Sequence, residues 1–512
     1  MAKLNGVGTR AKSTSAVKAV KSTAKNHNDA KGNLRTAKSE LFLLGVSSFN
    51  ESKFYENVSE QHKRIGTLVN SVLDDADGSV WLYEFVKYLR GEANIRTTSI
   101  IVALETAKAM ISKQIAGGRG IVNVALQRAD EPGEAIAYWH SKYGRKIPAA
   151  VKRGIADAVV RLYNEYSVLK YDSASNAYRF ADVIQLVHPN PQDATQSAVF
   201  NLALNRRYGN NSSIELLSKS EARSGVTGTE LRDMANEGTL TAYVRKAGLT
   251  WESVSGRIVG GMDAKVWEQL IPTMGYMATL RNLRNFIEAG VSVEVLDSVA
   301  KRISDKDQVA KSKQLPFRFY SAYKATSSSD QFKLAIGRAF DASVQNVPSL
   351  PGRTLVLVDM SGSMYWDHSK HSGANLAETA ALFGVAVAQR ADNADLVTFG
   401  TTSRKHKFSS TESSLSLVSR INSGLGGTDI NAALDLHFNG QDRVIVITDE
   451  QYSAPLKTDG KTPLYIWNLA GYRVGSKTDS NITYIGGGLS DASFKTVPLI
   501  EAARDSNWPW EQ

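Results

Sequence analysis

The 512-residue chain contains no cysteine. This absence excludes a disulfide framework, thiolate metal sites and cysteine nucleophiles, and it fits a protein that stays in a reducing compartment. No apolar run approaches the ~18 residues that a helix needs to cross a bilayer, and the N-terminus lacks the apolar core of a signal peptide. We therefore expect a cytoplasmic protein without a membrane segment.

Acidic residues are too few in the first two thirds of the chain to balance the basic ones. Residues 1–350 contain 47 Lys and Arg against 34 Asp and Glu, whereas residues 351–512 contain 14 against 17. All of the excess positive charge is therefore N-terminal. A basic region of this kind is the electrostatic footprint of a polyanion-binding protein, because each lysine or arginine near a phosphate releases counterions. The alternative is that the charge only keeps the chain soluble.

Large apolar side chains are also rare in the first 40 residues, nine of which are lysine or arginine. Such a segment cannot offset its ordering entropy by burial, so residues 1–40 are predicted to be a disordered basic arm. In residues 41–345 apolar side chains return every three or four positions, as do Trp81, Phe85 and Leu89. This spacing predicts successive helices stacked as a HEAT-like α-solenoid, although no exact repeat length is present.

The pattern changes near residue 350, where Pro348 and Pro351 interrupt the chain. Short β-branched runs then alternate with a helical pattern. Unbroken apolar strands that alternate with helices are typical of a parallel sheet covered on both faces, so residues 346–512 are predicted to be a doubly wound α/β domain. The predicted strands are Leu355–Val358, Leu396–Phe399, Val444–Ile447, Tyr465–Trp467 and Ile482–Ile485.

Oxygen-bearing side chains follow two of these strands, and another lies in a loop. A D-x-S-x-S motif comes directly after the first strand, Thr428 lies in a Gly-Gly-Thr-Asp loop, and Asp449 follows the strand that ends at Ile447. Doubly wound sheets bind ligands at the carboxyl ends of their strands. Ligands that are all oxygen select a hard divalent cation, Mg²⁺ before Mn²⁺ or Ca²⁺. The predicted metal ligands are Asp359, Ser361, Ser363, Thr428 and Asp449.

This donor set predicts an adhesion point rather than a hydrolytic centre. Three hydroxyls and at most two carboxylates leave a divalent ion under-neutralised, so an external carboxylate or phosphate oxygen can complete it. The sequence has neither a placed general base nor a histidine–carboxylate triad, and we therefore expect no enzyme activity. The structural alternative is a tight turn in which the serines only form hydrogen bonds.

Basic residues between positions 138 and 163 are interleaved with four aromatic ones, Tyr138, Trp139, Tyr143 and Tyr163. Cations can contact phosphates while aromatic faces stack unpaired bases, a combination that tolerates many RNA sequences. The alternative is a solvated basic face with Trp139 and Tyr163 in the core. Arg206 and Arg207, beside Tyr208, extend the set. The predicted RNA-binding residues at this point are Lys142, Arg145, Lys146, Lys152, Arg153, Arg206 and Arg207.

A basic helical region followed by a D-x-S-x-S domain resembles the Ro ribonucleoprotein family. That family joins a helical TROVE module to a von Willebrand A domain with a metal-ion-dependent adhesion site. The stretches that carry the resemblance are Asp77–Trp81, Phe85–Asn94, Gly144–Asn164, Lys170-Tyr171, Phe180–Pro189, Trp267–Leu270, Met277–Leu283 and Leu315–Phe317.

The resemblance implies a ring of helical repeats closed by the von Willebrand A domain, which we expect to be monomeric. It also implies quality control of non-coding RNA, with single-stranded ends of misfolded RNA in the central hole and Y RNA on the outer basic surface. Lys170 and His188 are added as RNA-binding residues, against the alternative that His188 only caps a helix. Ala174 stands where the family has a second basic residue, and the nearest arginine is Arg179.

In bacteria the family's partners include an exoribonuclease, polynucleotide phosphorylase, joined through Y RNA. A rival interpretation is a protein-interaction scaffold in which the metal site docks an acidic peptide and the basic surface serves solubility. A nuclease is a third possibility, but the sequence contains no constellation that would catalyse hydrolysis.

Overall fold

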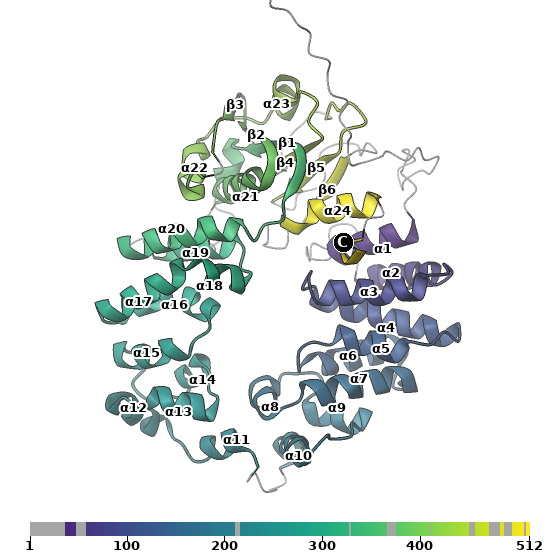
Figure 1. Cartoon of the computed structure of the whole chain (residues 1–512), viewed down its shortest axis with the longest axis vertical. Coiled ribbons are helices and arrows are strands. Elements are labelled where there is room, and N and C mark those ends of the chain that lie inside the picture. The colour runs from purple at the N-terminus through teal and green to yellow at the C-terminus, as the bar shows by residue number, and fades with distance from the viewer. Residues whose placement is uncertain are drawn as a thin grey trace, which may run out of the picture. The chain divides into compact units, whose positions relative to one another are not determined.

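The structure is a computed structural model of the whole chain (Figure 1). It describes residues 36–47, 58–209, 216–326, 329–365, 375–409, 411–449, 456–469, 482–485, 494–505 and 508–511. These residues form two compact units, of which one is Thr36–Asn346 and the other contains the chain from Val347 onward. No helix among the described residues is both long and apolar enough to cross a membrane.

In the first unit the described residues form helices joined by loops and turns. Its elements are α1 Ala37–Ser47, α2 Val58–Val72, α3 Gly78–Arg90, α4 Arg96–Ser112, α5 Gly118–Ala125, α6 Glu131–Tyr143, α7 Ala149–Leu162, α8 Glu165–Tyr171, α9 Phe180–Val187, α10 Ala194–Tyr208, α11 Ser218–Arg223, α12 Gly228–Glu237, α13 Leu240–Ala247, α14 Trp251–Ser255, α15 Ala264–Leu270, the 3₁₀ turn η1 Ile271–Thr273, α16 Tyr276–Glu288, α17 Val293–Ser304, α18 Lys306–Ser312, α19 Pro316–Ala325 and α20 Asp330–Val344.

The helical unit begins before residue 41, the boundary that the sequence suggested. Residues 1–35 lie outside the described residues, but Ala37 and Glu40 belong to the first turn of α1. Leu41 and Phe42 are fully buried, and the Phe42 ring packs on Phe85 with 5.7 Å between ring centroids. The apolar residues that follow position 40 therefore extend the helix backward into the basic segment.

Apolar spacing explains the helices and their stacking. Trp81, Phe85 and Leu89 form the buried face of α3, as predicted. Along the chain α5 packs on α3, α4 and α7 (Figure 1). A Cβ atom on Gly154 of α7 would lie 2.6 Å from the carbonyl oxygen of Arg119 in α5, so only glycine permits this close approach. The unit is thus a solenoid in which each helix packs mainly on near neighbours.

The described residues of the second unit form a sheet with flanking helices. Its elements are β1 Leu350–Asp359, η2 Gly362–Tyr365, α21 Leu376–Arg390, β2 Ala391–Phe399, β3 Ser403–His406, α22 Ser414–Ile421, α23 Ile430–His437, β4 Arg443–Thr448, β5 Leu464–Asn468, β6 Ile482–Ile485, α24 Thr496–Asp505 and η4 Pro509–Glu511.

The strand order is β3-β2-β1-β4-β5-β6. The five predicted strands are present and pair in parallel, with Val356 of β1 between Leu396 of β2 and Ile445 of β4. The edge strand β3 runs antiparallel to β2 and was not predicted. Because the order reverses between β1 and β4, the carboxyl ends of these two strands flank the crevice where such sheets bind ligands.

Both faces of the sheet are covered. On one face Gly384 of α21 lies so close to Val358 that a Cβ atom would come within 2.4 Å of its Cγ2. On the other face Leu357, Phe399 and Val446 belong to a buried cluster with Ala433 of α23. The predicted fold class, a helical solenoid with a doubly wound α/β domain, is therefore confirmed. Closure of a ring by the second domain stays a prediction.

Candidate metal centre and nucleic-acid interface

Two buried carboxylates lie at the carboxyl ends of β1 and β4. Asp359 is the last residue of β1, and Asp449 directly follows β4. Neither residue is exposed to solvent. The two strands are adjacent and parallel, so their ends meet at the same edge of the sheet. The structure therefore brings together two of the predicted metal ligands that are 90 positions apart in the sequence.

Neutral groups hold the Asp359 carboxylate. Its Oδ1 accepts a hydrogen bond of 2.8 Å from the Ser361 backbone amide, and its Oδ2 accepts one of 2.6 Å from the Thr448 hydroxyl. Burial raises the pKa of Asp359 to about 6, against the effect of these hydrogen bonds and with a further contribution from the charge of Asp449. The two carboxylates thus share the crevice, and no basic side chain among the described residues is bound to Asp359.

The remaining predicted ligands approach the same edge through two loops. The Ser361 and Ser363 hydroxyls are 3.3 Å apart. The Gly362 amide donates to the Gly426 carbonyl at 2.7 Å, and the Leu425 amide donates to the Met360 carbonyl at 2.8 Å. These bonds fasten the loop that carries half-buried Thr428 beside the D-x-S-x-S turn.

This arrangement fits a hard divalent cation. The donors are carboxylates and hydroxyls, which are the ligands that Mg²⁺ and Ca²⁺ accept. Among the described residues no cluster of three or more His, Cys, Asp or Glu could hold a metal, so the hydroxyls would have to contribute. Thr448 is a residue that sequence reasoning missed. It directly precedes Asp449, and only the pairing of β1 with β4 reveals that it bonds Asp359.

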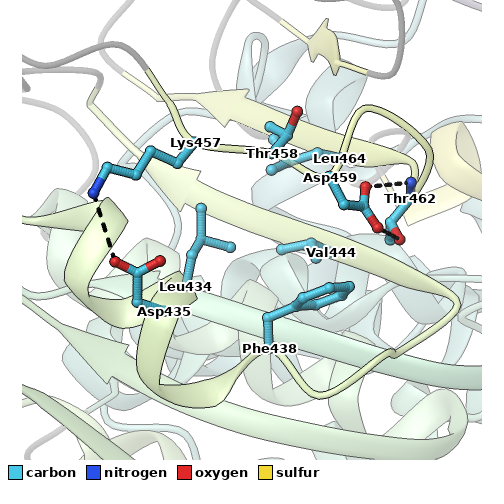
Figure 2. Close-up of a pocket in the computed structure, with 9 residues that line it drawn as sticks. All are labelled: Leu434, Asp435, Phe438, Val444, Lys457, Thr458, Asp459, Thr462 and Leu464. Atoms are coloured by element: carbon cyan, nitrogen blue, oxygen red, sulfur yellow. Dashed lines mark hydrogen bonds and ion pairs between the residues drawn. The ribbon is translucent and has the colours of Figure 1, made fainter.

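A cavity of about 290 Å³ lies at the other end of β4 (Figure 2). Its lining includes Val444 at the start of β4 and Phe438 just after α23. On its rim the Lys457 ammonium lies 3.8 Å from an Asp435 carboxylate oxygen. Asp459 accepts hydrogen bonds from its own loop, which lowers its pKa against the effect of burial. The charged groups on the rim therefore already have partners among neighbouring residues. The full lining is Leu434, Asp435, Phe438, Val444, Lys457, Thr458, Asp459, Thr462 and Leu464.

In the helical unit, Lys142 balances a buried acid. Glu105 of α4 is only 4% exposed, and the Lys142 ammonium lies 3.0 Å from its Oε2. The Tyr138 and Tyr143 hydroxyls donate to the same carboxylate at 2.7–2.8 Å. Glu105 therefore binds three residues of the predicted RNA-binding cluster, Lys142, Tyr138 and Tyr143. The sequence could not show this, because Glu105 lies more than 30 positions away.

Lys142→Ala is expected to destabilise the helical unit by about 2 kcal/mol, because it leaves the buried Glu105 carboxylate without a cation. Chemical denaturation monitored by circular dichroism would measure the change. Lys146→Ala serves as the matched control, since Lys146 is exposed on the following loop and should change stability by less than about 0.5 kcal/mol. Equal stability of the two variants would contradict the role assigned to Lys142.

Four other predicted residues form what we call the α7 basic cluster: Arg145, Lys146, Lys152 and Arg153. They lie on the loop after α6 and in the first turns of α7. Lys152 is half-buried and the others are exposed. None of the four forms an ion pair with a residue in the described parts of the chain, and their charge is therefore available to an anion such as phosphate.

Lys170 contacts two tyrosine rings of α8. Its ammonium is 5.3 Å from the Tyr166 ring centroid and 5.1 Å from that of Tyr171. Burial lowers the pKa of Lys170, but a 3.1 Å hydrogen bond to the Tyr166 hydroxyl and interactions with Tyr171 outweigh this, so the pKa is raised. Lys170 therefore stays charged and fixed in orientation.

The other predicted basic residues are more constrained. Arg206 lies 3.5 Å from the fully buried side chain of Asp172, which also binds Arg179 at 2.7 Å. Arg207 lies 3.2 Å from Asp182. Arg179, the arginine nearest in sequence to Ala174, is therefore held by Asp172. Both predicted residues remain partly exposed, so neither is excluded from contact with RNA.

His188 ends α9 in a left-handed conformation, with φ of 49° and its amide bonded to the Ile184 carbonyl at 2.9 Å. This is the capping geometry of the structural alternative. The His188 residue is nevertheless exposed. Capping uses only its backbone and leaves the imidazole accessible.

Comparison with known proteins locates a family match in the helical unit. Residues 246–336 match the TROVE domain. This segment contains the late stretches of the sequence resemblance, from Trp267 to Phe317, but not the stretches around Lys142 or Lys170. The match covers the later part of the helical unit and does not reach the predicted RNA-binding residues.

Curated relatives match a short segment. Telomerase protein component 1 from Mus musculus and that from Rattus norvegicus are each 38% identical over 76 residues, which is 14% of this chain and 3% of each relative. Among solved structures, the Ro (RSR) protein of Deinococcus radiodurans matches with a TM-score of 0.71 at 17% identity, covering 92% of this chain and 100% of that chain. Residues 246–336 are therefore similar to a TROVE domain, and the chain has a fold similar to that of the Deinococcus Ro protein.

Proposed function

We propose that this chain binds RNA as a Ro-type protein and has no enzyme activity of its own. The α7 basic cluster carries the proposal, because its four cations have no ion-pair partner among the described residues and suit a phosphate backbone. The TROVE match and the Ro fold support the same function.

At finer detail, we propose Y-like RNA as the ligand of the α7 basic cluster and single-stranded ends of misfolded non-coding RNA as ligands near Lys170 and His188. Fixed, protonated Lys170 suits a phosphate contact, and the exposed His188 ring can add a second one. An exoribonuclease such as polynucleotide phosphorylase, joined through the RNA, is the proposed partner of a monomeric cytoplasmic protein.

Binding of the full chain to a hairpin RNA, with or without a single-stranded 3′ tail, tests this function. We expect an affinity that falls as salt rises, because phosphate contacts release counterions. Lys170→Ala/His188→Ala should weaken binding to the tailed RNA alone. Loss with both RNAs would instead indicate a general role for the two residues, and no binding by the wild type would overturn the proposal.

We also propose that Asp359, Ser361, Ser363, Thr428 and Asp449 hold a divalent cation, with Mg²⁺ first. Such an ion would supply a positive charge between the two buried carboxylates and bind an acidic group from outside. This donor set favours the second candidate function, a scaffold that docks an acidic peptide. If removal of the cation with EDTA leaves RNA binding unchanged, the metal site and the RNA-binding residues have separate functions.

Magnesium is expected to stabilise the α/β unit by about 2.7 kcal/mol at a concentration 100 times its Kd, because it binds only the folded state. Thermal unfolding with Mg²⁺ and after EDTA treatment measures this shift. Asp449→Asn should abolish it. Asp435→Asn, a matched change at an exposed position of the same unit, should preserve it. If none of Mg²⁺, Mn²⁺ and Ca²⁺ changes the unfolding temperature of the wild type, the proposed metal site is wrong.

A further inference from the structure

Tyr166 differs from the aromatic residues that the sequence pattern selected. Trp139 and Tyr163 are 2% exposed and belong to the core, and Tyr138 and Tyr143 bond Glu105. Tyr166, in the first turn of α8, is 36% exposed. It is therefore an aromatic ring near the predicted RNA-binding residues that solvent, and hence a ligand, can reach.

The Tyr166 ring belongs to a row of alternating cations and aromatic rings. The Arg128 guanidinium lies 5.4 Å from the Tyr171 centroid, and the Lys170 ammonium contacts the rings of both Tyr171 and Tyr166. Contacts of this kind order the side chains before any ligand binds. We call these four residues the α8 ladder.

Both ends of α8 are fixed, so Tyr166 stands on a rigid element. At the start of α8 the side chains of Asn164 and Ser167 form a capping box, with bonds of 2.9 Å in each direction. After its last residue, the buried Asp172 binds Arg179 and accepts the Phe180 amide at 3.0 Å. A stacking residue held in this way loses little conformational entropy when it binds.

We propose that Tyr166 stacks an unpaired base of single-stranded RNA while Lys170 contacts a phosphate of the same strand. This inference rests on the proposed RNA-binding function and names one subsite within it. An exposed tyrosine beside a fixed cation combines the two contacts that non-sequence-specific single-strand binding needs, because every base has an aromatic face and every nucleotide a phosphate. Duplex RNA hides its base faces and cannot use the ring.

The test measures fluorescence anisotropy of the full-length protein with a 12-nucleotide uridine-rich single strand and with a blunt hairpin. The stem of this hairpin is closed by a non-nucleotide linker, so that it has no unpaired base. Tyr166→Leu should weaken single-strand binding by about tenfold and leave hairpin binding unchanged. Tyr166→Phe keeps the ring and removes the hydroxyl that bonds Lys170, and it should stay within about threefold of the wild type. Tyr83→Leu is the matched control, because Tyr83 is 38% exposed on α3 and packs beside Gly120 instead.

A second measurement locates the stacked base. A series of strands is made in which a single abasic nucleotide replaces each position in turn. The wild type should bind one of these strands more weakly than the intact strand, whereas Tyr166→Leu should bind both with the same affinity. Equal losses in Tyr166→Phe and Tyr166→Leu would assign the effect to the Lys170 hydrogen bond and overturn stacking. Wild-type affinity in Tyr166→Leu would overturn stacking but leave RNA binding intact, whereas a wild type that binds neither RNA would overturn both. Hairpin binding by Tyr166→Leu shows that the variant is folded.

Discussion

Arg443→Ala is expected to destabilise the α/β unit by about 3–5 kcal/mol. The Arg443 guanidinium, 2% exposed, binds the Glu501 carboxylate of α24 at 2.6 and 3.0 Å. It also donates to the Pro351 carbonyl and the Thr354 hydroxyl, at 2.6 and 2.9 Å. Removing it leaves a buried carboxylate and two acceptors without their charged donor, and this desolvation cost is the source of the large effect.

Denaturant unfolding followed through the tryptophan fluorescence of the unit measures this loss. Arg420→Ala is the matched control, because the Arg420–Glu412 pair in the same unit is partly exposed and should cost less than about 1 kcal/mol. A double variant, Arg443→Met/Glu501→Leu, should be less destabilised than Arg443→Ala, since it leaves no unpaired charge. If Arg443→Ala and Arg420→Ala lose equally little, the buried pair does not hold α24 to the sheet.

Replacing the four residues of the α7 basic cluster with alanine is expected to weaken RNA binding on the order of 100-fold at low salt. If each of the four contacts one phosphate, the slope of log K against log salt should also become shallower by about 3. Stability should change little, because these side chains have no ion-pair partner among the described residues. Filter binding at several salt concentrations measures both quantities.

The control carries the same loss of charge elsewhere in the helical unit. Four exposed lysines that form no ion pair within the described residues are changed to alanine together: Lys265, Lys301, Lys306 and Lys311. We expect this variant to bind RNA within about threefold of the wild type, because long-range charge alone is screened beyond ~10 Å at 0.1 M salt. Equal losses in the two quadruple variants would mean that net charge, and not the α7 basic cluster, sets the affinity.

The α/β unit was predictable in detail because its signals are local. Runs of β-branched residues such as Val444–Ile447 fit only a buried strand, and the D-x-S-x-S turn follows β1 directly. The edge strand β3 carries Arg404 and Lys405 and has no apolar run, so nothing in its sequence distinguished it from a loop. Its existence depends on pairing with β2.

The proposed RNA-binding surface was less predictable, because a charged residue in the sequence does not reveal which residue it pairs with. Lys142 and Arg153 look alike in the chain, yet Lys142 meets Glu105 from another helix and Arg153 meets solvent. The same limit applied to the aromatic residues. Tyr163 stacks on Phe180 at 4.0 Å inside the core, whereas Tyr166, three positions later, faces outward. Only tertiary packing separates the two.

The different reach of contacts in the two units has a consequence for how the protein acquires its structure. In the solenoid each helix packs mainly on near neighbours, so ordering can begin at several places and spread, at a small cost in loop closure. In the sheet, β1 must find β4 before the crevice exists, and the Asp359–Thr448 bond spans 89 positions. During synthesis, which proceeds from the N-terminus, the solenoid can therefore become ordered before the chain that completes the crevice has emerged.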